Sequence, residues 1–140
     1  MSSIQLITLI VHQYDPAISF FVNCLGFTLI EDKPALTNDG RPKRWVVVQP
    51  PGNTPAQTKI LLAQADGHEQ QSIVGRQFAG RVGLFWQVDD FDATYTQLLK
   101  HNFRFMSEPR TEEYGKVAVF LDLAGNRWDL LGPKPQGRVV

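Results

Sequence analysis

The side chain with the most chemical potential in this 140-residue sequence is a carboxylate inside an apolar run. Asp129 stands in the segment RWDLL (residues 127–131), which follows the turn-like segment DLAGN (residues 122–126). A carboxylate among apolar side chains can bind a metal ion, act as a general base, or accept hydrogen bonds from a ligand or from the protein. Which of these roles is possible depends on the other candidate residues in the sequence.

The three histidines do not complete a metal site around this carboxylate. His12 follows an apolar segment, His68 lies in a polar segment, and His101 stands near the end of a predicted helix. No two of them share a short metal-ligand spacing, so we expect each at the surface or near a helix end. One carboxylate alone cannot hold a divalent ion, because such sites use several converging ligands.

The composition excludes two classes of partner. Lys plus Arg and Asp plus Glu both number 14, so the chain lacks the basic excess of a nucleic-acid-binding protein. The apolar segment 4–11 is too short to span a membrane and lacks the features of a signal peptide. A single cysteine, Cys24, excludes an internal disulfide and fits a reducing compartment. We expect a cytoplasmic protein that binds neither nucleic acid nor membranes.

The elements that must position Asp129 occur in a repeated order. Apolar and β-branched segments predict strands over residues 4–11, 27–31, 44–49 and 58–63, and again over 81–88, 103–107, 116–122 and 126–131. A helix follows the first strand of each half. The first helix would have Asp15 as its N-cap and end at Gly26; the second would begin within 89–92 and end at Asn102.

The two halves match at an offset of about 77 residues. Val11 and Val88 each stand four residues before an aspartate at a predicted helix start. The repeat predicts an α+β fold of two βαβββ modules, over about 1–65 and about 80–133, joined by a polar linker over about 66–79. Each module is too small to bury its sheet alone, so the modules must pair within one chain or between chains.

These patterns resemble the vicinal oxygen chelate superfamily, which includes glyoxalases, bleomycin resistance proteins and extradiol dioxygenases. The resemblance rests on DPAISFFVNCLGF (residues 15–27) and VAVFLDLAGNRWDLL (residues 117–131), and it extends over nearly the whole chain. It implies paired βαβββ modules that form a cupped mixed sheet around a ligand cavity, with the helices outside. It also implies a homodimer.

The resemblance further implies where a metal ion would bind. Metal-using members place His, Glu or Gln ligands on the first and last strands of each module. The corresponding positions here hold Leu6, Gly83, Leu61 or Leu62, and Asp129. Because only the last can be a ligand, we expect no metal and no other cofactor.

Strand alternation predicts which side chains face the cavity. On the last strand, Asp129 would share a face with Arg127, while Trp128 and Leu130 pack outward; on the fifth strand, Phe85 would share a face with Gln87. The central strands leave two alternatives open, with either Trp45 or Arg44 toward the cavity. We expect the ligand-binding residues to be Asp129, Arg127, Gln87, Phe85, Arg110, Glu113, Tyr114, Arg44 and Gln77.

The segment 109–115 would lie over this cavity. Arg110, Glu113 and Tyr114 could form a gate that holds an anionic ligand, or an Arg110–Glu113 pair could merely order the loop. In the closing hairpin, Gly125 and Asn126 would supply the positive φ angles of the turn.

Two functions remain open from the sequence. The first is a metal-independent protein that binds a small-molecule ligand, of the resistance type, and it needs only a cavity. The alternative is an enzyme, a glyoxalase-like lyase, isomerase or dioxygenase, with a divergent metal site that uses His68 or Glu69 with Asp129. No catalytic residue is predicted. For Asp129 itself, structural hydrogen bonding, ligand binding and catalysis all stay open.

Overall fold

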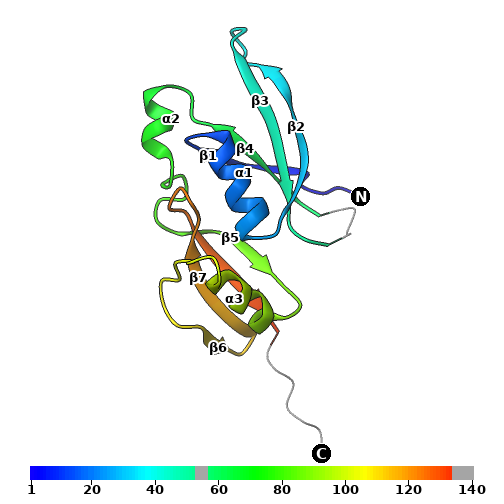
Figure 1. Cartoon of the computed structure of the whole chain (residues 1–140), viewed down its shortest axis with the longest axis vertical. Coiled ribbons are helices and arrows are strands. Elements are labelled where there is room, and N and C mark those ends of the chain that lie inside the picture. The colour runs from blue at the N-terminus through cyan, green and yellow to red at the C-terminus, as the bar shows by residue number, and fades with distance from the viewer. Residues whose placement is uncertain (53–56, 134–140) are drawn as a thin grey trace, which may run out of the picture. The chain divides into compact units, whose positions relative to one another are not determined.

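The computed structural model describes residues 1–52 and 57–133, and most of its helices and strands are labelled in Figure 1. Contacts within the chain divide it into two compact units, Met1–Gln77 and Phe78–Val140. The division falls inside the segment that was expected to be a linker.

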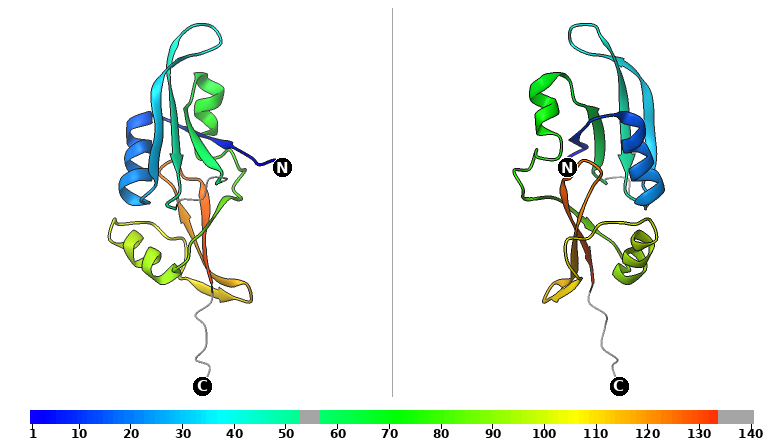
Figure 2. Two further views of the ribbon diagram at one scale, coloured as in Figure 1. Left: turned by 90° about the vertical axis from the view of Figure 1, so that its right-hand side faces the viewer. Right: turned by 60° about the vertical axis from the view of Figure 1, so that its left-hand side comes forward.

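The first unit has the order βαβββ. Its elements are β1 (Leu6–Val11), α1 (Tyr14–Ser19), a π-helical turn η1 (Phe20–Cys24), β2 (Thr28–Leu36), β3 (Pro42–Gln49), β4 (Lys59–Gln64) and α2 (Gly67–Ile73). The sheet order is β1-β4-β3-β2; β1 is parallel to β4, and the other pairs are antiparallel. The helix α1 packs against β3 and β4 (Figure 2).

The second unit repeats this order. Its elements are β5 (Val82–Gln87), α3 (Phe91–Leu99), β6 (Arg110–Glu112), β7 (Gly115–Leu121) and β8 (Arg127–Gly132). The sheet order is β5-β8-β7-β6, with β5 parallel to β8 and the other pairs antiparallel. The predicted α+β class with two βαβββ modules is therefore confirmed.

Each unit buries alternate residues of its strands against a helix, as the two-residue period of a strand requires. In the first unit, Val46, Val48 and Leu62 are fully buried, together with Phe21 of η1. In the second, Phe120, Trp128 and Leu130 are buried. The rings of Phe120 and Trp128 stack at a centroid distance of 5.6 Å, which fixes β7 against β8 on the core side.

The helix ends confirm most of the predicted caps and correct one. Asp90 caps α3 by accepting a hydrogen bond from the backbone N–H of Ala93 at 3.1 Å. Gly26 and Asn102 adopt positive φ angles of 75° and 54°, as expected for helix ends. Asp15 is not the N-cap of α1, because the helix begins at Tyr14. The carboxylate of Asp15 pairs with Arg44 at 2.8 Å.

The hairpin of β2 and β3 is longer than predicted. The two strands were expected over residues 27–31 and 44–49, but β2 continues through Pro34 to Leu36 and pairs with β3 from Pro42 onward. Proline is tolerated there because β2 is an edge strand, where a missing N–H costs no interstrand hydrogen bond.

One helix was not predicted, and one predicted strand was wrong. The expected linker 66–79 contains the helix α2. Residues 103–107 make only an isolated bridge, Phe105 to Phe120, and the second strand of the module forms later, at β6. The rings of Phe103 and Phe105 pack on Phe120 instead, at centroid distances of 4.9 and 6.0 Å.

The closing turn between β7 and β8 is organised by a buried carboxylate. Oδ1 of Asp122 accepts hydrogen bonds from three backbone N–H groups, those of Ala124, Gly125 and Asn126. Oδ2 accepts from Asn126 Nδ2 at 3.1 Å and from Trp128 Nε1 at 3.0 Å. Of the two residues expected to have positive φ angles in this turn, Gly125 does, at 102°, and Asn126 does not.

Candidate functional site

The open face of the second sheet brings together several of the predicted site residues. In the strand register, Asp129 on β8 is the partner of Phe85 on β5 and of Val119 on β7. Side chains of register partners share a face, so Phe85 and Asp129 stand side by side, opposite the buried Trp128 and Leu130. Phe85 is 64% exposed. Gln87 and Arg127 lie on the same face and are also exposed.

Asp129 is the unusual group on this face. Its Oδ1 is buried and has no hydrogen-bond partner among the residues that the structure describes. Burial raises the pKa of this carboxyl group, and the positive charge of Arg110 partly offsets that rise. A partly desolvated carboxylate with an unused acceptor is suited to receive a hydrogen bond from a bound molecule.

Arg110 reaches this face from β6, whose register places it beside Val117 of β7. Its Nε donates to Glu112 Oε1 at 2.8 Å, and the pKa of the guanidinium is raised by this pair and by Tyr114. The ion pair between Arg110 and Glu113, one of the two expected alternatives, does not form. Glu113 and Tyr114 instead make the turn between β6 and β7. The expected gate is therefore a hairpin tip, and the Tyr114 ring is 67% exposed on it.

Gly83 stands at one of the positions where the family resemblance implies a metal ligand. A Cβ atom at this glycine would lie 2.2 Å from the ring of Phe78, far closer than any real contact. The β5 ladder is also irregular here, between Val82 and Leu84. The space that a ligand side chain would need is filled by an aromatic ring of the same unit.

The strand register of the first unit shows which of Leu61 and Leu62 corresponds to Asp129 of the second unit. Thr8 pairs with Leu61 in the first unit as Phe85 pairs with Asp129 in the second. Leu61, rather than Leu62, therefore corresponds to Asp129. Among the described residues, no three His, Cys, Asp or Glu side chains come together in a group that could hold a metal ion.

Arg44 lies on the helix side of the first sheet. Its guanidinium makes two hydrogen bonds to Asp32, at 2.7 and 3.1 Å, and one to Asp15 at 2.8 Å. It also lies over the ring of Tyr14, 5.1 Å from the centroid. These contacts join β3 to β2 and to α1. They settle the open alternative: Trp45 points to the face opposite α1.

Gln77 is bound to the backbone of β1. Its Oε1 accepts from the N–H of Ile10 at 2.8 Å, and its Nε2 donates to the carbonyl of Thr8 at 3.0 Å. Since β1 is at the edge of its sheet, the amide of Gln77 takes the place of a neighbouring strand. Both polar ends of this predicted ligand-binding side chain are thus occupied by protein.

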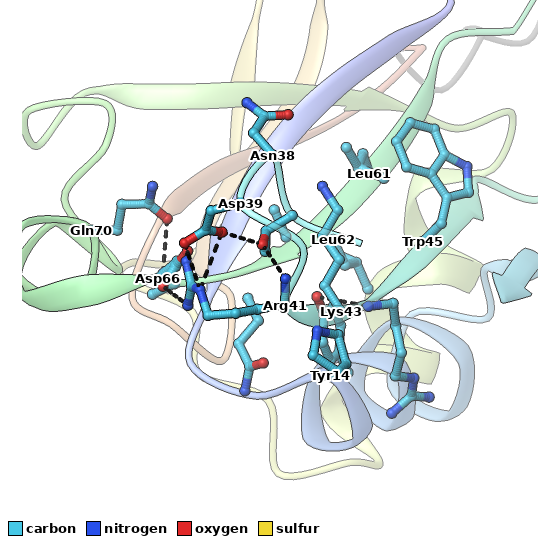
Figure 3. Close-up of a pocket in the computed structure, with 16 residues that line it drawn as sticks. Tyr14, Asn38, Asp39, Arg41, Lys43, Trp45, Leu61, Leu62, Asp66 and Gln70 are labelled. Atoms are coloured by element: carbon cyan, nitrogen blue, oxygen red, sulfur yellow. Dashed lines mark hydrogen bonds and ion pairs between the residues drawn. The ribbon is translucent and has the colours of Figure 1, made fainter. Parts of the chain in front are cut away.

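Lys43 was not predicted as a site residue, and Trp45 was predicted only as one of two alternatives. They help to line a pocket of about 480 Å³ at one end of the first sheet (Figure 3). The only local signal was the basic segment at 41–44, which by itself does not distinguish a pocket residue from a surface one.

The chain was compared with known proteins. The family model "Glyoxalase/Bleomycin resistance protein/Dioxygenase superfamily" matches residues 3–130. An uncharacterized protein of Shewanella frigidimarina (strain NCIMB 400) is 47% identical over 129 residues, which are 92% of each chain. Among the described residues, no helix is long and apolar enough to cross a membrane.

Two solved structures are similar over almost their full length. One is TnmS3, an antibiotic binding protein from Streptomyces sp. CB03234, with a TM-score of 0.72 and 27% identity, covering 96% of this chain and 98% of that one. The other is a member of the same superfamily from Sphaerobacter thermophilus DSM 20745, with a TM-score of 0.72 and 26% identity, covering 94% and 98%.

Proposed function

This chain belongs to the glyoxalase/bleomycin resistance protein/dioxygenase superfamily, and we propose that it binds a small organic molecule without a metal ion, as a resistance-type protein does. Its similarity to an antibiotic binding protein at 27% identity supports a binding role. The family also includes enzymes, so the proposal depends on the site.

The observation that carries the proposal is the pairing of Asp129 with Phe85. A buried carboxylate oxygen without a hydrogen-bond partner costs stability, and it leaves an acceptor free for a bound molecule. A large exposed aromatic ring stands directly beside it. Together they present one flat apolar surface and one acceptor, the combination that small-molecule sites use for affinity and orientation.

The independence from metal rests on the other three positions of the implied ligand set. Leu6 and Leu61 have no donor atoms, and Gly83 has no room for a side chain because of the Phe78 ring. A divalent ion at Asp129 would have one carboxylate and no further ligand from these positions.

The experiment begins with protein purified without a tag and analysed for metals by plasma mass spectrometry. The protein is then treated with a chelator and screened by thermal shift with aromatic antibiotics and small carboxylates. We expect a substoichiometric metal content and at least one ligand that raises the melting temperature after chelation. Stoichiometric zinc, nickel or iron, with ligand binding that disappears after chelation, would overturn the proposal.

That contrary outcome would favour the enzyme alternative, a lyase, isomerase or dioxygenase with a divergent metal site. Its suggested ligands, His68 and Glu69, lie on α2 in the first unit, and Asp129 lies in the second. We also propose a homodimer and a cytoplasmic location. Light scattering tests the first, since a monomeric mass would contradict it, and cell fractionation tests the second.

A further inference from the structure

Asp66 occupies the N-cap position of α2 but does not cap this helix. Its backbone has φ and ψ angles of −116° and 110°. Asp90, which caps α3 by accepting from the N–H of Ala93, has similar backbone angles, −126° and 96°. Within the described part of the chain, the Asp66 carboxylate makes no such bond to α2. The backbone at Asp66 therefore has the conformation of a capping residue, while its side chain points elsewhere.

The Asp66 carboxylate is bound instead by Arg41, at the tip of the β2–β3 hairpin. The two terminal nitrogens of Arg41 donate to its two oxygens at 3.0 and 2.7 Å, and Nε donates to Asp39 (Figure 3). The side chains of Arg41 and Asp66 are 55% and 44% exposed, so water screens their attraction. Because Asp39 also pairs with Arg41, the guanidinium keeps a carboxylate partner if Asp66 turns away.

Part of a helix cap is already formed at Asp66. Its backbone N–H donates to Gln70 Oε1 at 2.8 Å, a return contact similar to the one that completes a capping box. In such a box the N-cap side chain accepts from the N–H three positions further on, which here belongs to Glu69. The missing bond is the one that the Asp66 carboxylate would make after leaving Arg41.

The helix α2 has little else to stabilise it. It has seven residues, none of them buried, and its first residue, Gly67, has a φ angle of 85°. A helix this short is marginal without packing, and its first N–H groups have no partner inside the helix. An aspartate N-cap and an exposed ion pair make comparable, small contributions to stability. Neither position of the Asp66 carboxylate is therefore strongly preferred over the other.

We propose that Asp66 is a switch between the hairpin tip and α2. In the position that the structure shows, it holds the tip through Arg41 and leaves α2 uncapped. In the other position it accepts from the N–H of Glu69, so that α2 gains order and the tip is released.

The switch changes the slack of one segment of the first unit. The helix α2 lies between the end of β4 and Gln77, whose amide is bound to β1. An extended residue spans about twice the length of a helical one, so a frayed α2 gives this segment more slack than a capped α2. This role is independent of ligand binding at Asp129.

The test is hydrogen exchange, measured by NMR on the full chain. The amides of Gln71, Ser72 and Ile73 report on α2, because their acceptors lie within the helix. The amide of Gly40, which donates to the carbonyl of Thr37 at 3.0 Å, reports on the hairpin tip.

Three variants separate the two positions of Asp66. Arg41→Gln removes the competing partner. Asp66→Asn keeps an oxygen that caps well but loses the charge that attracts Arg41. Arg41→Gln combined with Asp66→Ala removes the partner and the cap together. Lys33→Gln is the matched control, because it removes an exposed cation of the same hairpin that pairs with Glu31.

We expect exchange in α2 to slow about five-fold in Arg41→Gln and in Asp66→Asn, the effect of a typical N-cap. Exchange at Gly40 should become faster in Asp66→Asn. The double variant and Lys33→Gln should both exchange in α2 at the rate of the unaltered chain.

The switch is overturned if Arg41→Gln or Asp66→Asn leaves exchange in α2 unchanged or makes it faster, since Arg41 would then only tie the tip to α2. It is also overturned if the double variant keeps the slower exchange, because the gain would then not come from the Asp66 carboxylate.

Discussion

The ring of Phe78 occupies the space that any side chain at position 83 would require, because a Cβ atom there would lie 2.2 Å from its Cδ2. The two residues lie five positions apart, on the segment that leads into β5 and on β5 itself. A metal ligand at position 83 and this orientation of Phe78 exclude each other. The second unit has the βαβββ order, and an aromatic ring fills the space beside a position where the family resemblance implies a ligand.

This relationship predicts the cost of a single methyl group. Gly83→Ala should lower the free energy of unfolding by about 1–3 kcal/mol, since overpacking forces the ring or the strand to move. In a Phe78→Ala background the same substitution should cost much less, because the obstacle is gone. Urea denaturation of the four proteins measures this coupling. Equal costs in both backgrounds would show that Phe78 does not occupy the space.

Asp129 predicts a stability that depends on pH. Burial raises its pKa in the folded protein, so its contribution to stability is fully present below the unfolded pKa and is lost as the pH rises through the folded value. Asp129→Asn should therefore be more stable than the unaltered chain at pH 7. The difference should disappear below about pH 4, the ordinary range of an aspartate.

Denaturation at several pH values checks this expectation. Arg127→Gln, on the same strand and face, is the control, because an arginine keeps its charge throughout this range. A variant Asp129→Asn that is less stable than the unaltered chain at pH 7 would mean that the carboxylate has a stabilising partner.

Replacing Asp122, in the closing hairpin, should cause a large loss of stability. Its two oxygens accept five hydrogen bonds from N–H donors, so the amide of Asp122→Asn would place a donor against donors. We expect the free energy of unfolding to fall by about 3 kcal/mol. Asp89→Asn, at an exposed carboxylate, should cause no measurable change. If both variants unfold at the same urea concentration, the network around Asp122 has no stabilising role.

Replacing Gln77 should destabilise the edge of β1. Gln77→Leu removes both hydrogen bonds to Ile10 and Thr8 and should cost about 1–2 kcal/mol. Gln77→Glu can still accept from Ile10, but its second oxygen would face the Thr8 carbonyl, so it should cost at least as much as Gln77→Leu. Amide hydrogen exchange at Ile10 reports the contact directly, with Gln71→Leu on α2 as the control. Unchanged protection in Gln77→Leu would refute the bond.

Sequence patterns over a few residues were enough to predict which side chains share a strand face and where a helix ends. Alternation along β5 and β8 placed Phe85 with Gln87, and Asp129 with Arg127, on one face, and the register confirms both sets. The helix end at Gly26 follows from the conformational freedom of glycine. The offset of about 77 residues was enough to predict two modules.

The remaining features depend on contacts between distant residues. Nothing in the sequence near Gln77 indicates that its amide binds Ile10 and Thr8, which lie 67 and 69 residues earlier in the chain. The position of the Phe78 ring beside Gly83 depends on the course of the chain between them. Pro34 reads as a strand end unless β2 is known to be an edge strand, which is a property of the whole sheet. The helix α2 lacks the apolar periodicity that would have identified it, and none of its residues is buried.

The central claim is that Asp129 contributes to binding a small organic molecule without a metal ion. Calorimetric titration of chelator-treated protein with a ligand found in the thermal-shift screen tests it most directly, with Asp129→Asn and Arg127→Gln measured alongside. We predict that the chelated protein keeps its full affinity and that Asp129→Asn loses at least about ten-fold, while remaining folded at pH 7. Full affinity in Asp129→Asn, or affinity that returns only when a divalent metal is added, would contradict the account.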